Sequence, residues 1–404
     1  MQIAIDAAGF SPGEADRLRQ AMGSKRSKAR MAVMRERLMA GMAERDIVGE
    51  TAEEIATKLE AFAHFGFPES HSVSFAYLVY SSAWVKYHHP DAFACALLNA
   101  QPMGFYSPHT IVRDAIRHGV EVLGPCVRAS RRDCTLEERT EAAGPVGAPQ
   151  RGWHAAPSTR AMRVGLRYVR GLSGALLDRI DATHESDGPG AGIPGEGGPF
   201  ADLEDFTRRT HAPVDALEAL ATAGAFACFG VDRRDALWAA GALGEVRPGR
   251  LPGVVTGVEA PRLPGMDPIE ETAADLWSTG LSAGAHPTEH ARERLAARGA
   301  VTAAALRDLP HRAIVEVGGV VTHRQQPETA NGVVFLNLED ETGLVNVICT
   351  PDVWKRFRVV ARTSPALCVR GLLERNQGVV NLVARRIEAL DLRSAALLRS
   401  RDFR

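Results

Sequence analysis

Residues 62–87 read FAHFGFPESHSVSFAYLVYSSAWVKY and carry the strongest fold signal in the chain. A Phe-Gly-Phe-Pro turn at 65–68 precedes Glu-Ser-His-Ser, and the apolar pattern of a helix follows. Core packing is the expected role of most of the rings, but a core does not require a Ser/His cluster at the start of the helix. Eight of the chain's twenty-four aromatic residues lie here: Phe62, Phe65, Phe67, Phe75, Tyr77, Tyr80, Trp84 and Tyr87.

A basic segment lies upstream of this aromatic stretch. Residues 17–37 contain eight lysines and arginines against one acid, Glu36. Basic charge beside an aromatic helix favours a polyanionic partner, either nucleic acid or nucleotide. The net charge of the whole chain is only −1, which excludes a uniformly basic coat, so such binding must use local patches.

Composition indicates a globular protein of several domains. A chain of 404 residues is long enough for two to four domains, each with its own core. No apolar run reaches the length of a membrane span, and the N-terminus lacks the layout of a signal peptide, so we expect a cytoplasmic protein without membrane partners. The six cysteines form no Cys-x-x-Cys pair, which favours reduced thiols over zinc ligands or disulfides.

The chain divides by pattern into a mainly helical part and a β-rich part. Helical periodicity dominates residues 1–120 and returns at 161–245, while 121–160 is expected to be an irregular connector. A linker and a helical segment are expected at 246–310, and a tail at 392–404. The helices expected in the first region are Lys28–Arg45, Thr51–Phe62, Ser72–Tyr87, Pro90–Asn99 and Pro108–His118, preceded by one that starts at Ser11-Pro12-Gly13-Glu14.

Residues 311–391 change to the period of strands. Five strands with a helix between the third and fourth is the element order of an OB-fold barrel. The fold class predicted is therefore multidomain, mainly α-helical and followed by a β-barrel. The strands are expected at Ala313–Val321, Val333–Leu338, Leu344–Cys349, Ala366–Leu373 and Val379–Ile387, and the helix at Asp352–Ala361.

Two clusters in the first region are candidates for binding a nucleotide. Arg19, Lys25 and Arg26 flank a glycine, so backbone amides and cations can meet a phosphate there, although the spacing is not that of a Walker A loop. A solvated helix end is the favoured alternative. Ser70 and His71 begin the aromatic helix, where helix capping plus a structural histidine is the favoured alternative.

The segment YVRGLSGALLDRI, residues 168–180, is a candidate helix-hairpin-helix. A short helix, a turn and a second helix would present backbone N–H groups at Gly171, Ser173 and Gly174 to a DNA phosphate, which suits binding without sequence preference. A plain pair of packed helices with a glycine cap is an equally good interpretation.

A similar unit is expected in LATAGAFACFGVDRRDAL, residues 220–237. Gly224 marks its turn, and Arg233 and Arg234 favour phosphate contact slightly over simple helix packing. The alternative of glycine caps applies here as well.

The expected barrel offers a second surface for nucleic acid. His323 and Arg324 leave the first strand, and Phe335 and Asn337 lie on the second, on the face that OB-folds use for single strands. Alternation along the strand favours a core position for Phe335. The acids 339–341 are expected to form a strand-to-strand turn in preference to a metal site, and His286 with His290 lacks the glutamate of a zinc motif.

Several long stretches resemble bacterial C-family DNA polymerases. The stretches GFSPGEADRLRQAMGSKRS (9–27), AFAHFGFPESHSVSFAYLVYSSAWVKYHHPDAF (61–93) and LLNAQPMGFYSPHTIVRDAIRHGV (97–120) are similar to the fingers of these enzymes. The stretches QPMGFYSP (101–108), LEALATAGAF (217–226), VTHRQQPETANGVVFLNLEDETGLVNV (321–347) and SRDFR (400–404) resemble the error-prone, damage-inducible branch. The resemblance covers nearly the whole chain.

The resemblance implies fingers at 1–120, a DNA-binding helix-hairpin-helix region at 161–245 and an OB-fold at 311–391. It implies translesion synthesis on a DNA template-primer from deoxynucleoside triphosphates with Mg²⁺, and recruitment to a sliding clamp through accessory proteins. Arg19, Lys25 and Arg26 correspond to the basic fingers motif near the triphosphate, although Gln20 stands where many family members have a second arginine.

One expected motif is missing from the sequence. Two-metal phosphoryl transfer needs paired carboxylates, which the family carries as Asp-x-Asp on a palm domain, and no Asp-x-Asp occurs in these residues. The chain thus resembles the C-terminal portion of such a polymerase and is expected to be inactive alone and to bind no metal. A non-catalytic protein that holds single-stranded or template DNA is the alternative, and an RNA-binding OB protein is a third.

Overall fold

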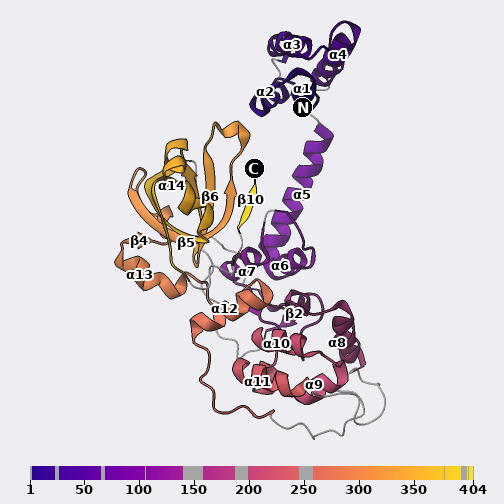
Figure 1. The fold of residues 1–404 in the computed structure, drawn as a ribbon, viewed down its shortest axis with the longest axis vertical. Helices are drawn as coiled ribbons and strands as arrows, with labels where there is room; N and C mark the ends of the chain where they lie inside the picture. Colours follow the sequence, from indigo (N-terminus) through magenta and orange to yellow (C-terminus); the bar gives the residue numbers. More distant parts are fainter. Residues whose placement is uncertain are drawn as a thin grey trace. The chain divides into compact units, whose positions relative to one another are not determined.

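The computed structural model describes residues 2–22, 27–64, 69–104, 106–139, 158–186, 199–244, 258–376, 378–392, 398 and 400–403. They form two compact units, of which the first holds residues 1–83, 325–334 and 403–404 and the second holds 84–324 and 335–402. Each unit is described by itself (Figure 1). No helix in the described ranges is long and apolar enough to cross a membrane.

The first unit is built from packed helices. The predicted cap is present, because the Ser11 hydroxyl accepts a hydrogen bond from the Glu14 N–H at 3.3 Å and the Glu14 carboxylate accepts one from the Ser11 N–H at 2.8 Å. Small residues such as Ala4, Ala15 and Ala56 are fully buried in the core. The helices are α1 (Gln2–Ala8), α2 (Pro12–Met22), α3 (Ser27–Ala43) and α4 (Glu50–His64).

Helix α5 (Glu69–His88) carries the aromatic stretch and differs from expectation. The rings whose side chains are described are exposed instead of packed in a core: Tyr77 is 74% exposed and Tyr80 73%. Apolar residues occur on all sides of the helix, a pattern that normally marks a helix buried all round. The prediction of core packing is therefore wrong for these rings within the chain.

A small α/β layer follows α5. Two helices, α6 (Pro90–Asn99) and α7 (Pro108–Arg117), pack on a sheet of order β1-β3-β2 through a shared core. The strands are β1 (Glu121–Leu123), β2 (Thr135–Glu138) and β3 (Arg160–Arg163). Residues 121–160, expected to be irregular, thus supply two of these strands, because β1 pairs in parallel and β2 antiparallel with a strand that begins at Arg160.

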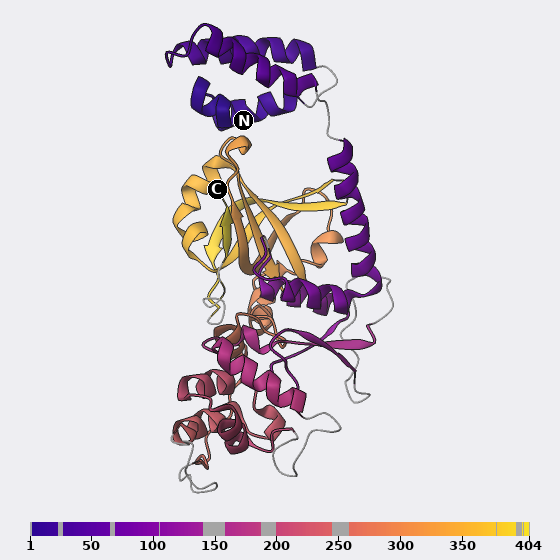
Figure 2. The ribbon, with the colours of Figure 1, turned by 90° about the vertical axis from the view of Figure 1, so that its right-hand side faces the viewer.

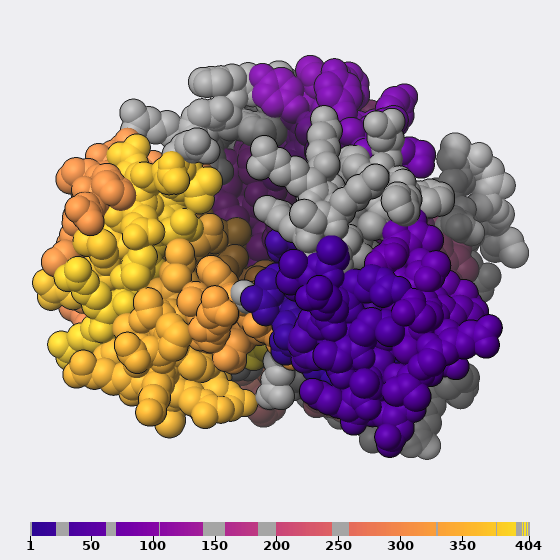
Figure 3. Space-filling view, turned by 90° about the horizontal axis from the view of Figure 1, so that it is seen from above, coloured from indigo at the N-terminus to yellow at the C-terminus, as the bar shows by residue number. Residues whose placement is uncertain are grey.

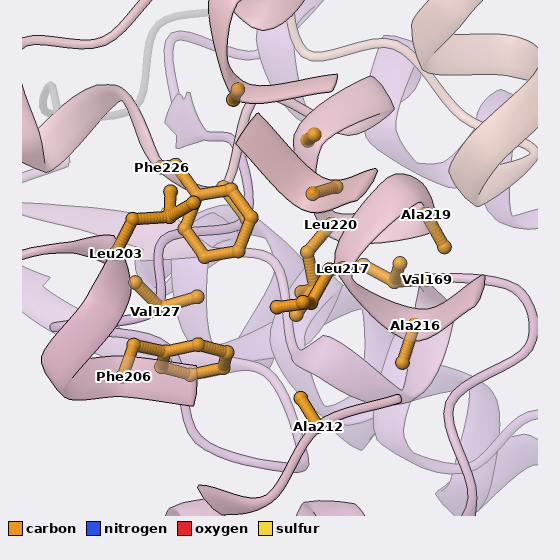
Figure 4. Close-up of a cluster of buried hydrophobic side chains, with 14 of the residues drawn as sticks. Val127, Val169, Leu203, Phe206, Ala212, Ala216, Leu217, Ala219, Leu220 and Phe226 are labelled. Carbon is orange, nitrogen blue, oxygen red and sulfur yellow. The ribbon is translucent and has the colours of Figure 1, made fainter. Parts of the chain in front are cut away.

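The next region is a bundle of short helices around an aromatic core. Phe200, Phe206 and Phe226 meet edge to face at centroid distances of 4.9 and 5.4 Å. Leu217 and Leu220 belong to the same core as Phe206 and Phe226 (Figure 4). The elements are η1 (Leu166–Tyr168), α8 (Gly174–Ser186), α9 (Leu203–Thr210), α10 (Val214–Thr222), η2 (Ala227–Phe229), α11 (Arg233–Leu243) and α12 (Pro268–Thr279). The short helix predicted before the Gly171 turn is only the 3₁₀ turn η1.

The β-rich region is a barrel with the predicted element order. The strands run β5-β6-β7-β9-β8 and the barrel closes by pairing β5 with β8, while β7 and β9 pair in parallel. The strands are β5 (Ile314–Gln325), β6 (Val334–Asp340), β7 (Gly343–Cys349), β8 (Ala366–Asn376) and β9 (Val379–Ala389), and α14 (Pro351–Thr363) lies between β7 and β8. Figure 2 shows α14 against the strands, and Figure 3 shows the barrel's outer surface in orange and yellow. The OB-fold prediction is confirmed.

Shorter elements precede and follow the barrel. They are η3 (Glu289–Ala291), α13 (Arg292–Ala297), β4 (Ala300–Val301), η4 (Ala305–Arg307), η5 (Glu328–Ala330) and β10 (Arg401–Phe403). Strand β4 extends the sheet by pairing in parallel with β5.

Candidate nucleic-acid interface

The turn at Gly171–Gly174 leads into α8 and is open to solvent. Gly171 has a φ of +81°, and no atom lies within 4 Å of the position that a Cβ would take. The Ser173 hydroxyl caps α8 by accepting a hydrogen bond from the Leu176 N–H at 3.2 Å. In the described part of the chain, no acceptor bonds to the N–H groups of Gly171, Leu172 or Gly174. Free N–H groups at a helix N-terminus form an anion-binding site.

Arg170 adds a positive charge to the Gly171 turn. Its backbone is fixed by a hydrogen bond from its N–H to the Ser278 carbonyl at 2.8 Å. Its side chain is exposed, and no described residue pairs with its guanidinium. By contrast, the nearby Arg132 is paired with Asp178 at 2.6 Å. Arg170 was not among the predicted site residues, although it directly precedes the turn.

The turn at Gly224 is closed by its own hydrogen bonds. The Gly224 N–H donates to the Ala221 carbonyl at 3.0 Å, and the Ala225 N–H donates to the Leu220 carbonyl at 2.9 Å. With φ of +72° at the glycine, this is a Schellman cap of α10. A Cβ at this position would lie 3.0 Å from the Arg233 guanidinium. The glycine-cap interpretation therefore describes this turn.

Arg233 and Arg234 have partners within the protein. Arg233 bonds to the Asp275 carboxylate at 2.7 Å and to the Thr222 carbonyl at 3.0 Å. Arg234 bonds to both oxygens of Glu270 at 2.9 Å. These ion pairs hold α11 against α12. The N-cap of α11 is the exposed carboxylate Asp232, a poor neighbour for a phosphate.

The barrel presents a polar outer face on β6, β7 and β9. Phe335 and Asn337 alternate with buried Leu336 and Leu338, so Phe335 is half-buried on the outer face and not in the core as predicted. Asn346 on β7 pairs in register with Asn381 on β9. Among the described residues, no group bonds to the side-chain amides of the three asparagines 337, 346 and 381. Asn346 and Asn381 were not selected, although alternation along β7 points to the first.

His323 and Arg324 are placed differently from the residues of this face. Both are buried, at 6% and 8% exposure. The Arg324 guanidinium donates to the carbonyls of Ala361 and Ser364, each at 2.7 Å, and so fixes the end of α14. The His323 Nδ1 lies 3.0 Å from the Thr322 hydroxyl. A contact with nucleic acid at Arg324 would have to replace these internal bonds.

The acids 339–341, predicted to form a turn, lie partly on the strand: Glu339 and Asp340 end β6, Glu341 begins the turn to β7, and arginines hold the group. Arg117 of α7 pairs with the buried Glu339 at 2.9 Å, and Arg292 pairs with Glu341 at 2.5 Å. The Asp340 carboxylate accepts bonds from the Ala303 and Thr342 N–H groups at 2.8 Å. Burial raises the pKa of Glu339, against the opposing effect of Arg117. The described residues contain no group of three or more possible metal ligands.

Two histidines stack beside this acidic turn. The rings of His109 and His286 lie 5.6 Å apart, and both are buried. Burial and the nearby Arg113 and Arg117 lower the pKa of His109 to about 3, and burial and the same neighbours lower that of His286. His290 instead bonds to the Thr272 hydroxyl at 2.9 Å. The two histidines of the sequence pair therefore have separate partners.

The nucleotide-binding candidates of the N-terminal helices are exposed where they are described. Arg19 pairs with Asp16 at 2.8 Å with most of its side chain in solvent. Ser70 and His71 lie in the first turn of α5, where the His71 ring contacts the Phe75 ring in a tilted arrangement at a centroid distance of 4.5 Å. Lys25 and Arg26 lie outside the described residues. The nucleotide-binding role of these five residues therefore stays a prediction.

Three known families match successive parts of the chain. Residues 1–46 match the bacterial DNA polymerase III alpha subunit finger domain, 119–236 the helix-hairpin-helix motif, and 315–390 the OB-fold nucleic acid binding domain. A solved asparaginyl-tRNA synthetase from Pyrococcus horikoshii is 17% identical over a match that covers 23% of this chain and 23% of that one, at a TM-score of 0.20.

Curated relatives match along the whole chain. They are named error-prone DNA polymerase and include proteins from Mycolicibacterium paratuberculosis, 49% identical over 409 residues, Nocardia farcinica, 48% over 413, and Anaeromyxobacter sp., 46% over 404. Each match covers 100% of this chain but only 33–34% of the relative. The chain therefore spans about a third of the length of these relatives.

Proposed function

The whole chain is homologous to a segment that makes up about a third of the length of an error-prone DNA polymerase. From this premise we propose that the chain is the DNA-binding C-terminal part of such an enzyme. In this role it binds template-primer DNA and positions the incoming deoxynucleoside triphosphate during translesion synthesis in the cytoplasm. The observation that carries the proposal is the open Gly171 turn, with unbonded N–H groups and an exposed arginine at the N-terminus of α8.

Duplex DNA is the ligand that we propose for the Gly171 turn. Backbone N–H groups recognise a phosphate without reading a base, which suits an enzyme that accepts any sequence. Gly171, Ser173 and Gly174 form the contact, and Arg170 neutralises an adjacent phosphate. Gly224, Arg233 and Arg234 were predicted to contact DNA, but their internal bonds make them weaker candidates.

Single-stranded template is the ligand that we propose for the barrel. Phe335 offers a ring for base stacking, and the three asparagine amides offer donors and acceptors that no described group uses. His323 and Arg324 were also predicted to contact nucleic acid, but their burial and internal bonds make them weaker candidates.

The aromatic helix α5 supports a role within a larger enzyme. A helix with this much exposed apolar surface requires a covering partner. We propose that the covering partner is the remainder of the polymerase together with the nucleotide. The residues proposed to meet the triphosphate are Arg19, Lys25, Arg26, Ser70 and His71.

Catalysis is proposed to require residues outside this chain. Mg²⁺ would supply charge stabilisation for phosphoryl transfer, but the sequence has no Asp-x-Asp, and no cluster of ligands occurs in the described ranges. The residues present do not fit a two-metal site. Recruitment to the sliding clamp through accessory proteins is proposed on the resemblance alone.

Primer extension and DNA binding test the proposal together. The isolated chain should bind primer-template DNA with a steep salt dependence and should extend no primer in the presence of Mg²⁺. Extension by the chain alone would refute the requirement for outside carboxylates. Strong binding to single strands without any binding to duplex would favour the alternative, a non-catalytic single-strand-binding protein.

A further inference from the structure

Two of the six cysteines differ from the rest in environment. Cys95, Cys134, Cys349 and Cys368 are buried, whereas Cys126 and Cys228 are half-buried. The two half-buried cysteines line the same cleft, which has a volume of about 460 Å³. Both cysteines therefore belong to the wall of one cleft.

The backbones that carry the two cysteines are bonded to each other. The Val127 N–H donates to the Ala225 carbonyl at 3.0 Å, and the Arg128 guanidinium donates to the Cys228 carbonyl at 3.1 Å. Cys126 is itself fixed by Ser130, whose N–H donates to the Cys126 carbonyl at 2.7 Å. Two segments about a hundred residues apart in sequence are thus held in register at these positions.

The two thiols have unequal acidity. The Cys228 thiol donates a hydrogen bond to the Ala225 carbonyl at 3.8 Å, and the Ala129 N–H donates to the Cys126 carbonyl at 3.2 Å. The neighbouring Cys228 side chain, the backbone of Arg128 and Ala129 and the charge of Arg163 lower the pKa of the Cys126 thiol to about 6, against the opposing effect of burial. The neighbouring Cys126 and burial raise the pKa of Cys228. Cys126 is therefore the thiol that ionises first.

We propose that Cys126 and Cys228 form a redox pair that a peroxide closes reversibly into a disulfide. The Cys126 thiolate attacks one peroxide oxygen, so that an S–O bond forms, the O–O bond breaks, and hydroxide leaves to become water by taking up a proton. The Cys228 sulfur then attacks the Cys126 sulfur: the S–S bond forms and the S–O bond breaks. The departing hydroxide takes the Cys228 proton as a second molecule of water. Two sulfurs lose two electrons to one peroxide, and a dithiol reverses the reaction by exchange.

The disulfide would fix the turn after α10 to the segment that follows β1. The backbone contacts already hold these segments together. Accessible thiolates poised next to a second cysteine are the usual arrangement of oxidation-sensitive sites.

The test is peptide mapping of the full chain after oxidation. Protein freed of reductant is treated with hydrogen peroxide, the remaining thiols are alkylated, and the digest is analysed without reduction. We expect a linked Cys126–Cys228 peptide that disappears after dithiothreitol, while the four buried cysteines remain alkylated. In Cys228→Ser the Cys126 sulfenic acid should accumulate and be trapped by dimedone, and Cys126→Ser should leave Cys228 unmodified.

A second measurement needs no variant. The alkylation rate of Cys126 in the untreated chain should be half-maximal near pH 6 and, at pH 7, at least about thirtyfold above that of Cys134, since the thiolate is the nucleophile. Oxidation of Cys126 to sulfinic acid without a link to Cys228 would overturn the proposal. Equal alkylation rates at Cys126 and at the buried cysteines would overturn it as well.

Discussion

The Gly171 and Gly224 turns each lead toward the N-terminus of a helix, and each has a glycine at positive φ. At Gly171 the space beyond the glycine is empty and the N–H groups that follow have no acceptor among the described residues. At Gly224 the N–H groups close a Schellman cap, and Arg233 fills the space beside the glycine. The N-cap residue is Ser173 for α8, which follows the first turn, and Asp232 for α11, which follows the second turn and η2.

This difference separates a binding turn from a structural turn. A glycine at positive φ permits both arrangements, so the glycine alone does not define a phosphate site. What defines the site is whether the N–H groups remain unbonded and whether a cation or a carboxylate stands beside them. On both criteria the Gly171 turn is the proposed DNA contact and the Gly224 turn is a cap.

The largest effect is expected from Ser173→Asp. Aspartate caps a helix as well as serine does, so α8 should keep its stability. The new carboxylate would repel a DNA phosphate at the helix N-terminus, where α11 has the carboxylate of Asp232. We expect affinity for duplex DNA to fall at least about tenfold, as for the loss of a charge-assisted hydrogen bond. Fluorescence anisotropy measures the affinity. Ser173→Asn is the matched neutral cap and should keep the affinity; an equal loss in both variants would contradict the assignment.

Gly224→Ala should lower the stability of the folded chain more than its affinity for DNA. A side chain at a φ of +72° costs about 1–2 kcal/mol, and here it also displaces Arg233 from its bonds with Asp275 and Thr222. The matched Gly171→Ala carries the backbone cost without a clash. Thermal melting should therefore show the larger loss of stability at Gly224. A larger loss at Gly171 would reverse the comparison.

Acidic pH should lower the free energy of unfolding without lowering the affinity of the Gly171 turn for DNA. The pKa of His109 is about 3 in the folded chain and about 6.5 when unfolded, so the unfolded chain binds an extra proton between these values. Stability should therefore fall as pH drops below about 6.5, by about 1.4 kcal/mol per pH unit for this residue. Melting curves of His109→Asn should show a shallower dependence on pH. The turn contains no group that titrates in this range, so the DNA affinity of the folded chain should stay constant.

A smaller effect is expected from the two arginines beside the turns. Arg170→Gln removes an exposed cation without a described partner, so the slope of log affinity against log salt should fall by about 0.9, the value for one phosphate contact. Arg234→Gln removes a cation already paired with Glu270, and the slope should stay unchanged. Binding titrations at several salt concentrations measure both. An unchanged slope in Arg170→Gln would remove this residue from the interface.

The barrel and most helices could be predicted from periodicity alone. Alternating strands and a helix after Thr350 define an OB-fold because each strand has one face in the core. The α6 boundaries Pro90–Asn99 were predicted without error, since a proline opens this helix.

The candidate site was less predictable because it depends on tertiary partners. Nothing local in the sequence reveals that Arg233 and Arg234 meet Asp275 and Glu270 about forty residues away. The exposure of Tyr77 and Tyr80 was missed for a related reason: an apolar pattern does not say which partner covers it. The sheet was missed for the same reason, because β1 and β2 pair with β3, which lies more than twenty residues further along the chain than β2 begins.

Hydrogen exchange of the full chain, with and without primer-template DNA, tests the comparison most directly. In the free protein the amides of the Gly171–Gly174 turn should exchange rapidly, while those of Gly224 and Ala225 should already be protected by the α10 cap. The account predicts that DNA adds protection to peptides covering 170–176 and leaves those covering 222–232 unchanged. New protection at 222–232 with none at 170–176 would contradict it.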